Sequence, residues 1–518
     1  MTTIKKAAKS ATIIMIFTLA SKFLGFFREM LIANKFGAGA ETDAFFIAMT
    51  VLALVVGIIA TGINTTLIPV LAEIETKEGK DRKNKYVSNI LNVLVIGLFV
   101  VSILGIIFAP LLVRLLAKGF SGAQFGLAVE LTRIALLMSV FMGAFNIFVA
   151  FLHSNNEFAL PAAIGFPFNA VYLFFLFFLA LRFGIRGLMI AAVFAVIAKL
   201  LFILPSVYKN GFRYRFRINF KDPYLKKNFL LVGPIIAGVM VHQVNIIIDR
   251  TLASTLVAGS ISALNFGLRL NGLILGVFVV SITTVVFPML SKSASENDID
   301  SVRNVTKYGI NLILLITIPV IAGILVLSTP IVQILFERGA FDATATQMTS
   351  TALIYYSLGL VGIGTSTLLQ RVYFSMQDTK TPMYVGIVSV VINIVLNLIL
   401  INYLAHGGLA LATSIALSVS AILLILGLKK KMGNIGGKSI LDCFIKASIS
   451  SAIMGVVVFF MYNFMITRFV GTTILNAFSL ASSVAVGALV YFILCHLLNI
   501  KEVRMITNKG IEIVRKRF

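Results

Sequence analysis

Six basic side chains lie within stretches of this chain that are apolar enough to cross a membrane. These cations are Lys22, Arg28, Arg133, Lys199, Arg250 and Arg269. A charge in hydrocarbon is costly unless it faces a cavity or a partner, so it marks a functional site by default. Arg offers a planar fork that matches two phosphate oxygens, and Lys supplies a compact charge. The pattern predicts a site within the bilayer for an anionic substrate.

The alternative for each cation is snorkelling to an interface or a salt bridge that joins two helices. This alternative fits Arg133, Lys199 and Arg250 better than the other three. Lys22 and Arg28 lie six residues apart, which is about 240° in helical projection, so they cannot both face one point. Arg28 therefore calls for a partner. The neighbouring Glu29 is expected to point elsewhere, which leaves Asp43.

A second group of polar residues predicts a cation site. Asp249 is the only carboxylate in its apolar stretch, and Asn393 and Asn397 are four residues apart, so they share one helix face. With Thr413 they would offer only hard oxygen ligands, the type expected for an alkali cation. The alternative is that Asn and Thr form hydrogen bonds between helices.

The elements that carry these residues are predicted to be membrane-spanning helices. Hydrophobic residues make up 59% of the chain and charged residues 12%. Apolar runs of about 20 residues span the hydrocarbon as helices, and no alternating pattern indicates a barrel. The fold class predicted is an all-α polytopic membrane protein. We expect 14 spans, centred near residues 21, 58, 100, 140, 171, 196, 241, 275, 316, 361, 393, 418, 452 and 485.

The distribution of basic residues predicts the orientation. With the N-terminus inside, inward-facing segments hold about 31 Lys and Arg, against about seven outward-facing and six within spans. Cytoplasmic loops carry this excess in membrane proteins, so both termini are predicted to be cytoplasmic. The net charge of +24 is spread over these loops, which favours anionic membrane lipids over nucleic acid as a partner.

The sequence disfavours metal chemistry, ATP hydrolysis and glycosyl transfer. Four scattered histidines and two distant cysteines match no metal-ligand spacing. No Walker sequence is present, so ATP hydrolysis is not expected. The outer loops are too short to carry the acidic catalytic residues of a glycosyltransferase, which leaves a non-enzymatic transporter without a cofactor. A cationic-drug exporter would favour acids over cations in its cavity, and a non-transporting scaffold protein is a third alternative.

An internal repeat indicates two related halves. Residues 44–69 align with 263–288 at a shift of 219, and Ser154, Glu157 and Pro161 fall on Ser375, Asp378 and Pro382 at a shift of 221. Six predicted spans separate the members of each pair, so the halves share orientation and are related by an axis along the membrane normal, as in secondary transporters. The predicted domains are an N-lobe (1–208), a cytoplasmic amphipathic connector (209–228), a C-lobe (229–432), and two further helices with a basic tail (433–518).

The chain resembles the MurJ (MviN) family of lipid II flippases. The likeness is carried by SKFLGFFRE at 21–29, FGAG at 36–39, TDAFF at 42–46, IDRTLAS at 248–254, GSISALN at 259–265 and QDTKTP at 377–382. The resemblance implies two six-helix lobes around a central cavity, plus two helices that form a lipid-facing groove. It implies as substrate an undecaprenyl-diphosphate-linked peptidoglycan precursor, moved between leaflets of the bacterial cytoplasmic membrane.

The resemblance also assigns roles to residues. It implies that Lys22, Arg28 and Arg269 face the cavity, with Asp43 as their charge partner and with Ser21 and Glu29 in the same motif. It implies a sodium site at Asp249, Asn393, Asn397 and Thr413, although a proton remains an alternative coupling ion. Many members carry an Arg in the second span where this chain has Val55-Val56-Gly57, and some carry an acid where it has Asn271-Gly272. These departures leave another polyprenyl-linked oligosaccharide open as substrate, and cell-wall synthesis proteins are expected partners.

Overall fold

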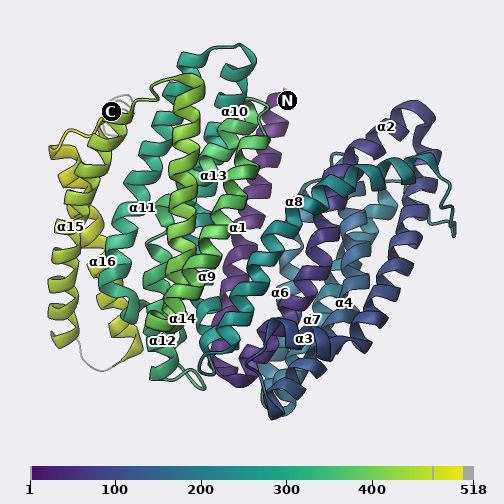
Figure 1. Cartoon of the computed structure of the whole chain (residues 1–518), viewed down its shortest axis with the longest axis horizontal. Helices are drawn as coiled ribbons and strands as arrows, with labels where there is room; N and C mark the ends of the chain where they lie inside the picture. Colours follow the sequence, from purple (N-terminus) through teal and green to yellow (C-terminus); the bar gives the residue numbers. More distant parts are fainter. Residues whose placement is uncertain (1–2, 469–471, 506–518) are drawn as a thin grey trace. The chain divides into compact units, whose positions relative to one another are not determined.

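The computed structural model describes residues 3–468 and 472–505, and nearly all of them are helical (Figure 1). No β-strand occurs among them. The helices are α1 (Thr3–Phe36), α2 (Ala40–Ile107), α3 (Ala109–Leu116), α4 (Gly122–Ser154), α5 (Ala159–Ala163), α6 (Gly165–Phe178), α7 (Ala180–Lys209), α8 (Pro223–Ser254), α9 (Ser260–Ile274), the π-helix η1 (Leu275–Val279), α10 (Val280–Ser295), α11 (Ile299–Phe336), α12 (Ala343–Ser357), α13 (Leu360–Ser375), α14 (Lys380–Met432), α15 (Gly437–Arg468) and α16 (Thr473–Leu497). The predicted all-α class is confirmed.

The helices and the predicted spans agree in position but not one for one. Nine helices in the described ranges are long and apolar enough to cross a membrane, and α12 with α13, bent by 46°, makes a tenth if the pair is one span. Each predicted centre lies within a helix, but α2 and α14 contain two each. The number of 14 spans therefore stays a prediction. The basic tail beyond residue 505 lies outside the described residues.

Breaks inside the longest helices explain this difference. Gly79 interrupts α2 with φ 80° and ψ 177°, a conformation that glycine adopts at little cost because it has no Cβ. It lies within the basic run from Lys77 to Lys85, so the chain turns where the sequence predicts a cytoplasmic loop. Ala405 interrupts α14 with φ 48° and ψ −130°. Each of these helices is therefore two rods joined at one residue.

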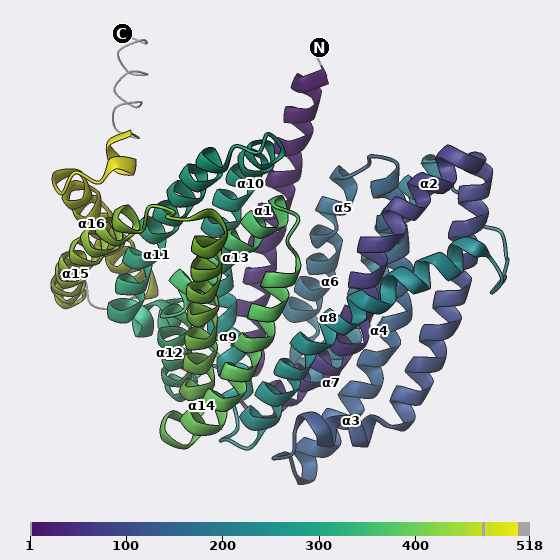
Figure 2. The same cartoon turned by 45° about the horizontal axis from the view of Figure 1, so that its top comes forward.

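The chain forms two compact units. Unit 1 comprises Met1–Ser262 and Arg338–Asp342, and unit 2 comprises Ala263–Glu337 and Ala343–Phe518. The buried core of unit 1 joins α2, α4 and α7, and α8 lies beside α2 in both views (Figure 2). The core of unit 2 surrounds α11 and includes α10, α13, α14 and α15. The lobe boundaries set at residues 208, 228 and 432 remain a prediction.

The repeat residues form the same local turn in both halves. Ser154 and Ser375 each donate to the carbonyl three residues back, to Phe151 and Val372, at 2.7 Å. Asn156 and Gln377 follow with φ of 60° and 59°, as expected of a left-handed residue that ends a helix. Each is followed by an acid, Glu157 or Asp378.

These acids accept a backbone hydrogen bond from the residue three positions later. Glu157 accepts from the Leu160 N–H at 3.4 Å, and Asp378 accepts from the Thr381 N–H at 3.0 Å. Acceptors at this position satisfy amides at the start of the next helix, here α5 or α14. The Ser, acid and Pro spacing found in the sequence is therefore a helix–turn–helix corner.

Candidate functional site

Arg28 is the best-defined of the intramembrane cations. Its side chain is 15% exposed, and its Nη2 lies 2.7 Å from Oε1 of Glu29, whose side chain is 6% exposed. Its Nη1 donates to Oδ1 of Asn169 on α6 at 3.2 Å. The expectation that Glu29 points away from Arg28 is therefore wrong. The two adjacent residues reach each other because both side chains are long enough to bend along the α1 surface.

Aromatic rings complete the surroundings of Arg28. Its guanidinium carbon lies 4.8 Å from the ring centre of Tyr172 and 5.4 Å from that of Phe168. Lys199 on α7 lies 5.5 Å from the same Phe168 ring and 4.4 Å from Phe145. A ring face attracts a cation, most strongly where water is excluded. Two intramembrane cations, from α1 and α7, thus meet at one aromatic residue of α6. We call Arg28, Glu29, Asn169, Phe168, Tyr172 and Lys199 the arginine cluster.

Close packing of α1 on α6 holds this cluster. A Cβ on Gly165 would lie 2.4 Å from the Ser21 Cβ, so only glycine allows this approach. One turn further along α6, Asn169 donates to the backbone oxygens of Gly165 at 2.8 Å and Ser21 at 3.4 Å. The predicted site residue Ser21 therefore lies at the α1–α6 contact. Small residues at membrane helix contacts allow this packing, and the Asn amide fixes its register.

Lys22 and Arg269 have different surroundings from Arg28. Lys22 is exposed on α1, beside the exposed Phe23. Arg269 is exposed on α9 and belongs to unit 2, whereas Lys22 and Arg28 belong to unit 1. The spacing argument that Lys22 and Arg28 face different directions agrees with one being exposed and the other largely buried. Joint binding of one anion by the three cations stays a prediction.

Asp43 is buried, and it accepts hydrogen bonds from a turn at the start of α9 instead of pairing with Arg28 as predicted. Its Oδ2 accepts from the Gly259 N–H at 2.7 Å. Its Oδ1 accepts from the Ser262 N–H at 2.7 Å and from the Ser262 hydroxyl at 2.5 Å. These donors lie at the start of α9, so the carboxylate ties the beginning of α2 to that turn. The prediction that Asp43 is the ion-pair partner of Arg28 is wrong, because Glu29 takes that place.

Three residues of the predicted cation site are joined in unit 2. Asn393 and Asn397 are buried on α14, and the Asn397 Nδ2 donates to the Asn393 Oδ1 at 2.9 Å. The Asn393 Nδ2 donates to the Thr413 Oγ1 at 3.3 Å, across the break at Ala405. The fourth predicted residue, Asp249, lies on α8 in unit 1. The cluster contains hard oxygens as expected. Its bond between Asn393 and Thr413 also joins the two halves of α14, as the alternative of hydrogen bonds between helices predicted.

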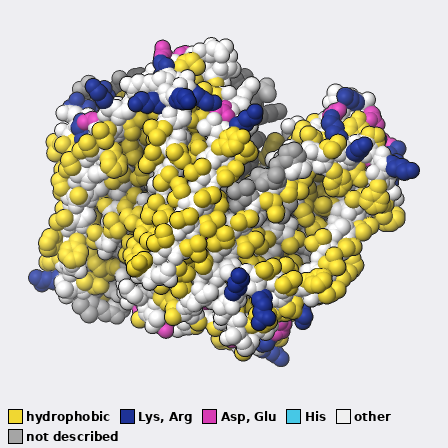
Figure 3. Space-filling view, viewed as in Figure 1, with side chains coloured by type: hydrophobic (Ala, Val, Ile, Leu, Met, Phe, Trp, Pro, Cys, Tyr) yellow, Lys and Arg dark blue, Asp and Glu magenta, His cyan; other side chains and the backbone are white. Residues whose placement is uncertain are grey.

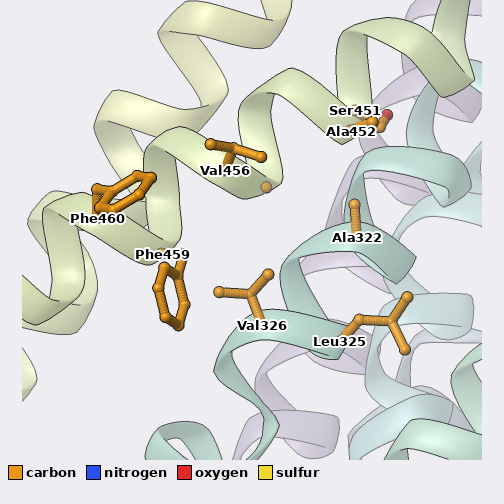
Figure 4. A pocket seen from close by; sticks show the side chains of 9 residues that line it. Ala322, Leu325, Val326, Ser451, Ala452, Val456, Phe459 and Phe460 are labelled. Atoms are coloured by element: carbon orange, nitrogen blue, oxygen red, sulfur yellow. The ribbon is translucent and has the colours of Figure 1, made fainter.

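Unit 2 has an apolar groove between α11 and α15 (Figure 4). Its volume is about 430 Å³, and it is lined by Ala322, Leu325, Val326, Ser451, Ala452, Gly455, Val456, Phe459 and Phe460. Phe459 and Phe460 are more than half exposed. An exposed apolar surface of this kind binds another apolar group, and in a membrane protein the surrounding lipid supplies it. The groove lies on the first of the two C-terminal helices that the resemblance assigns to lipid contact.

Sequence reasoning missed Asn169 and Tyr172. Asn169 is the only side chain of α6 that carries an amide, in a helix that otherwise reads GFPFNAVYLFFLFF. A lone amide in an apolar span calls for a hydrogen-bond partner, because an unpaired polar group in hydrocarbon costs several kcal/mol. That signal was available from the sequence. What it could not supply is which span contains the partner.

Solved structures share this fold. The chain matches a structure described as "Lipid II flippase MurJ, inward closed conformation" with a TM-score of 0.77 and 27% identity, over 93% of this chain and 98% of that one. It also matches an inward-facing multidrug resistance MATE family transporter of the MOP superfamily, with a TM-score of 0.70 and 14% identity over 83% of this chain. Together with the apolar helices, the likeness to the first of these structures defines a polytopic membrane protein with the fold of a flippase.

Sequence comparison narrows the class to one family. The family profile described as "Lipid II flippase MurJ" matches residues 32–505. A probable lipid II flippase MurJ of Buchnera aphidicola is 30% identical over 501 residues, which cover 95% of this chain and 97% of the relative. The lipid II flippase MurJ of Burkholderia cenocepacia is 30% identical over 80% of this chain and 82% of its own length. The chain belongs to the lipid II flippase MurJ family.

Proposed function

We propose that this protein moves lipid II, a polyprenyl diphosphate that carries the peptidoglycan precursor, from the inner to the outer leaflet of the bacterial cytoplasmic membrane. The observation that carries the proposal is the arginine cluster, which holds a cation inside an apolar helix pair at a site that α1 and α6 build for it. The same cluster holds Lys199 against aromatic rings within the apolar helices, and a cation placed there at such cost is suited to an anion such as the diphosphate head group of this substrate.

The charges of the cluster suit a diphosphate. Glu29 balances the charge of Arg28, so this pair alone is neutral. Lys199 has no carboxylate within ion-pairing distance among the described residues, and only aromatic rings face it. Lys22 is exposed on the same helix as Arg28. These two lysines therefore supply net positive charge, whereas Arg28 and Asn169 hold the geometry of the α1–α6 pair.

Transport would follow alternating access without an enzymatic step. An inward-open state takes the diphosphate while the polyprenyl tail stays in lipid, along a surface such as the α11–α15 groove. Closure of the inner side and opening of the outer side then release the glycan outside. The driving force would be the membrane potential or a sodium or proton gradient, with Asp249, Asn393, Asn397 and Thr413 as the coupling residues. Anionic phospholipids and cell-wall synthesis proteins are the expected partners, and no cofactor is required.

The test replaces Arg28 in purified protein that is reconstituted with lipid II. We expect Arg28→Ala to lower flipping at least about tenfold and to abolish complementation of a flippase-depleted strain. Arg28→Lys should restore little, because one ammonium cannot bond Glu29 and Asn169 in the same fork geometry. Arg133→Gln is the matched control, since Arg133 is exposed and bonds only the Ile106 carbonyl, at 3.3 Å. Normal flipping by Arg28→Ala would contradict the proposal.

If another polyprenyl-diphosphate glycan is the substrate, the same vesicles identify it. In that case Arg28→Ala should abolish transport of the other glycan, and the wild-type protein should not move lipid II.

A further inference from the structure

A segment of the predicted cytoplasmic connector runs along α2. Residues 211–220 have no helix and no strand, and their backbone is bonded to polar side chains of the second half of α2. Asn89 bonds Asn219 twice, with its Oδ1 accepting at 2.7 Å and its Nδ2 donating at 3.0 Å. Asn92 donates to the Arg217 carbonyl at 3.0 Å, and Ser88 accepts from the Arg215 N–H at 3.2 Å. We call residues 211–220 the strap.

The strap alternates cations with apolar side chains. Its sequence from residue 213 is Arg-Tyr-Arg-Phe-Arg-Ile-Asn-Phe, and all of these side chains except that of Asn219 are exposed. Phe216 is 78% exposed and Phe220 is 70% exposed. Large exposed aromatic side chains beside cations are typical of a segment at the membrane interface, where phosphates and acyl chains are both within reach. Figure 3 shows basic side chains gathered at this end of unit 1, next to hydrophobic surface.

An apolar pocket begins where the strap ends. It has a volume of about 430 Å³, and Phe220 of the strap lines it together with side chains of both halves of α2 and the first half of α8. On α2 these residues are Ile59, Ile63, Ile90, Val93, Leu94, Ile96, Gly97, Leu98 and Val101, and on α8 they are Leu225, Asn228, Phe229, Val232 and Ile236. At 1.5 Å per residue, the stretch from Ile90 to Val101 is about 16 Å long. That length matches one leaflet, which is half of a hydrocarbon core of about 30 Å.

One polar group lines the pocket near its strap end. Asn228 is 5% exposed, and its Oδ1 accepts from the Thr66 hydroxyl at 3.0 Å. Asn228 also forms a hydrogen bond with the Tyr86 hydroxyl. It is the one polar side chain among the described residues that line the pocket. The ester carbonyl of a glycerolipid, which lies between phosphate and acyl chain, would lie at this polar end of the pocket.

We propose that the strap and this pocket bind one anionic phospholipid of the inner leaflet, with its phosphate at Arg217 and Lys221 and one acyl chain in the pocket. Both cations are exposed, and neither forms an ion pair within the described ranges. Arg215, by contrast, pairs with Asp81 at 3.3 Å. A phospholipid fits better than a protein partner, because the pocket is apolar, is about as long as one leaflet, and lies next to the cations of the strap. The site lies in unit 1 and shares no residue with the arginine cluster, so it is separate from substrate binding.

The test uses the absence of tryptophan from the natural sequence. Phe220→Trp places a single fluorophore at the mouth of the pocket in the full-length protein, reconstituted in phosphatidylcholine vesicles. Brominated phosphatidylglycerol should quench it at least twofold more than brominated phosphatidylcholine at equal mole fraction. Adding Arg217→Gln and Lys221→Gln should remove this preference, whereas the charge-matched Lys429→Gln and Lys430→Gln should leave it. A tryptophan at the exposed Phe194 on α7 should show no preference.

A second variant tests the pocket itself. A Cβ at Gly97 meets no atom within 4 Å, so Gly97→Leu fills the pocket without a clash and should halve quenching by either lipid. Gly126→Leu on α4, which also meets no atom within 4 Å, should leave quenching unchanged. Equal quenching by the two lipids at Phe220→Trp, or a preference that survives loss of Arg217 and Lys221, would overturn the proposal. Displacement of brominated phosphatidylglycerol by equimolar undecaprenyl phosphate would identify the polyprenyl tail as the occupant instead.

Discussion

At the scale of single residues, Arg28 shows how a cation is held in an apolar span. Its charge is opposed by Glu29, one amino group is bonded to Asn169, and the guanidinium faces two aromatic rings. Each contact replaces part of the lost hydration, and charge-assisted bonds are the stronger kind. Asn169 holds this arrangement in place, because the same side-chain amide also donates to backbone carbonyls of α1 and α6.

We therefore predict that Asn169→Ala impairs transport although it removes no charge. It leaves Arg28 Nη1 without an acceptor, which should lower the free energy of unfolding by about 1–3 kcal/mol, and should slow lipid II flipping at least about fivefold. Thermal unfolding in detergent and flipping in vesicles measure the two effects. Asn402→Ala is the control, since exposed Asn402 bonds only the carbonyl of Leu398. Unchanged flipping in Asn169→Ala would refute a positioning role.

The residue types predicted the cations but not their neighbours. Lys22, Arg28 and Lys199 are visible in the sequence because charge in an apolar run is rare. The partner of Arg28 was not, since Asn169 lies 141 residues away and side-chain bending brings in Glu29. Asp43 was misassigned for the same reason. Its donors at Gly259 and Ser262 are 216 and 219 residues away, and no local pattern connects them.

At the scale of elements, the turn before α14 depends on Asp378. This carboxylate accepts from the Thr381 N–H and hydroxyl, at 3.0 and 2.6 Å, and it pairs with Lys431 at the other end of α14. Burial alone would raise its pKa, but the hydrogen bonds from Lys431 and Thr381 outweigh that effect and lower the pKa. One side chain thus caps the first half of α14 and holds the end of the second half beside it.

This arrangement predicts a stability that falls in acid. Because the pKa of Asp378 is lower in the folded protein, its contribution is complete above the unfolded value of about 4 and is lost as the pH falls below it. Asp378→Asn should destabilise the protein by about 1 kcal/mol at pH 7, as for loss of a helix cap, and by less near pH 3, where the unfolded carboxyl is protonated but the folded one is still largely ionised. Thermal unfolding from pH 3 to 7 measures the difference. A gap that widens in acid would contradict this assignment.

The positions of the helices were predicted better than the breaks and connections between them. The apolar runs located every helix that carries a predicted span, because hydrocarbon thickness fixes their length. The joints depend on single residues: Ala405 turns the chain at φ 48° although alanine gives no signal for a turn. The strap was expected as an amphipathic connector. Its course along α2 depends on Ser88, Asn89 and Asn92, which lie about 125 residues earlier and give no signal in the local periodicity.

At the scale of the whole molecule, the charge distribution predicts that both termini are cytoplasmic. The hairpin at Gly79 should then lie inside and the loop after α3 outside. Both native cysteines, Cys443 and Cys495, are buried, so they should react slowly with a membrane-impermeant maleimide. In spheroplasts, Lys118→Cys should be labelled directly, and Lys80→Cys only after permeabilisation. Labelling in the reverse order would invert the topology and with it the direction of transport.

Coupling of transport to an ion gradient is a property of the whole transport cycle. The Asn393 and Asn397 pair is the candidate site for the coupling ion. Their amides and Thr413 form one chain of hydrogen bonds across the two halves of α14, so an ion bound there would change how those halves pack. A unit charge moved through 100 mV supplies about 2.3 kcal/mol, enough to bias a transport cycle. We predict that sodium stimulates flipping in vesicles and that Asn397→Ala raises the sodium concentration for half-maximal rate at least about tenfold. Thr413→Ser, which keeps the hydroxyl, should stay near wild type and Thr413→Val should not. Flipping that responds to neither sodium, pH gradient nor potential would show that this cluster is structural only, with the amides serving to join helices.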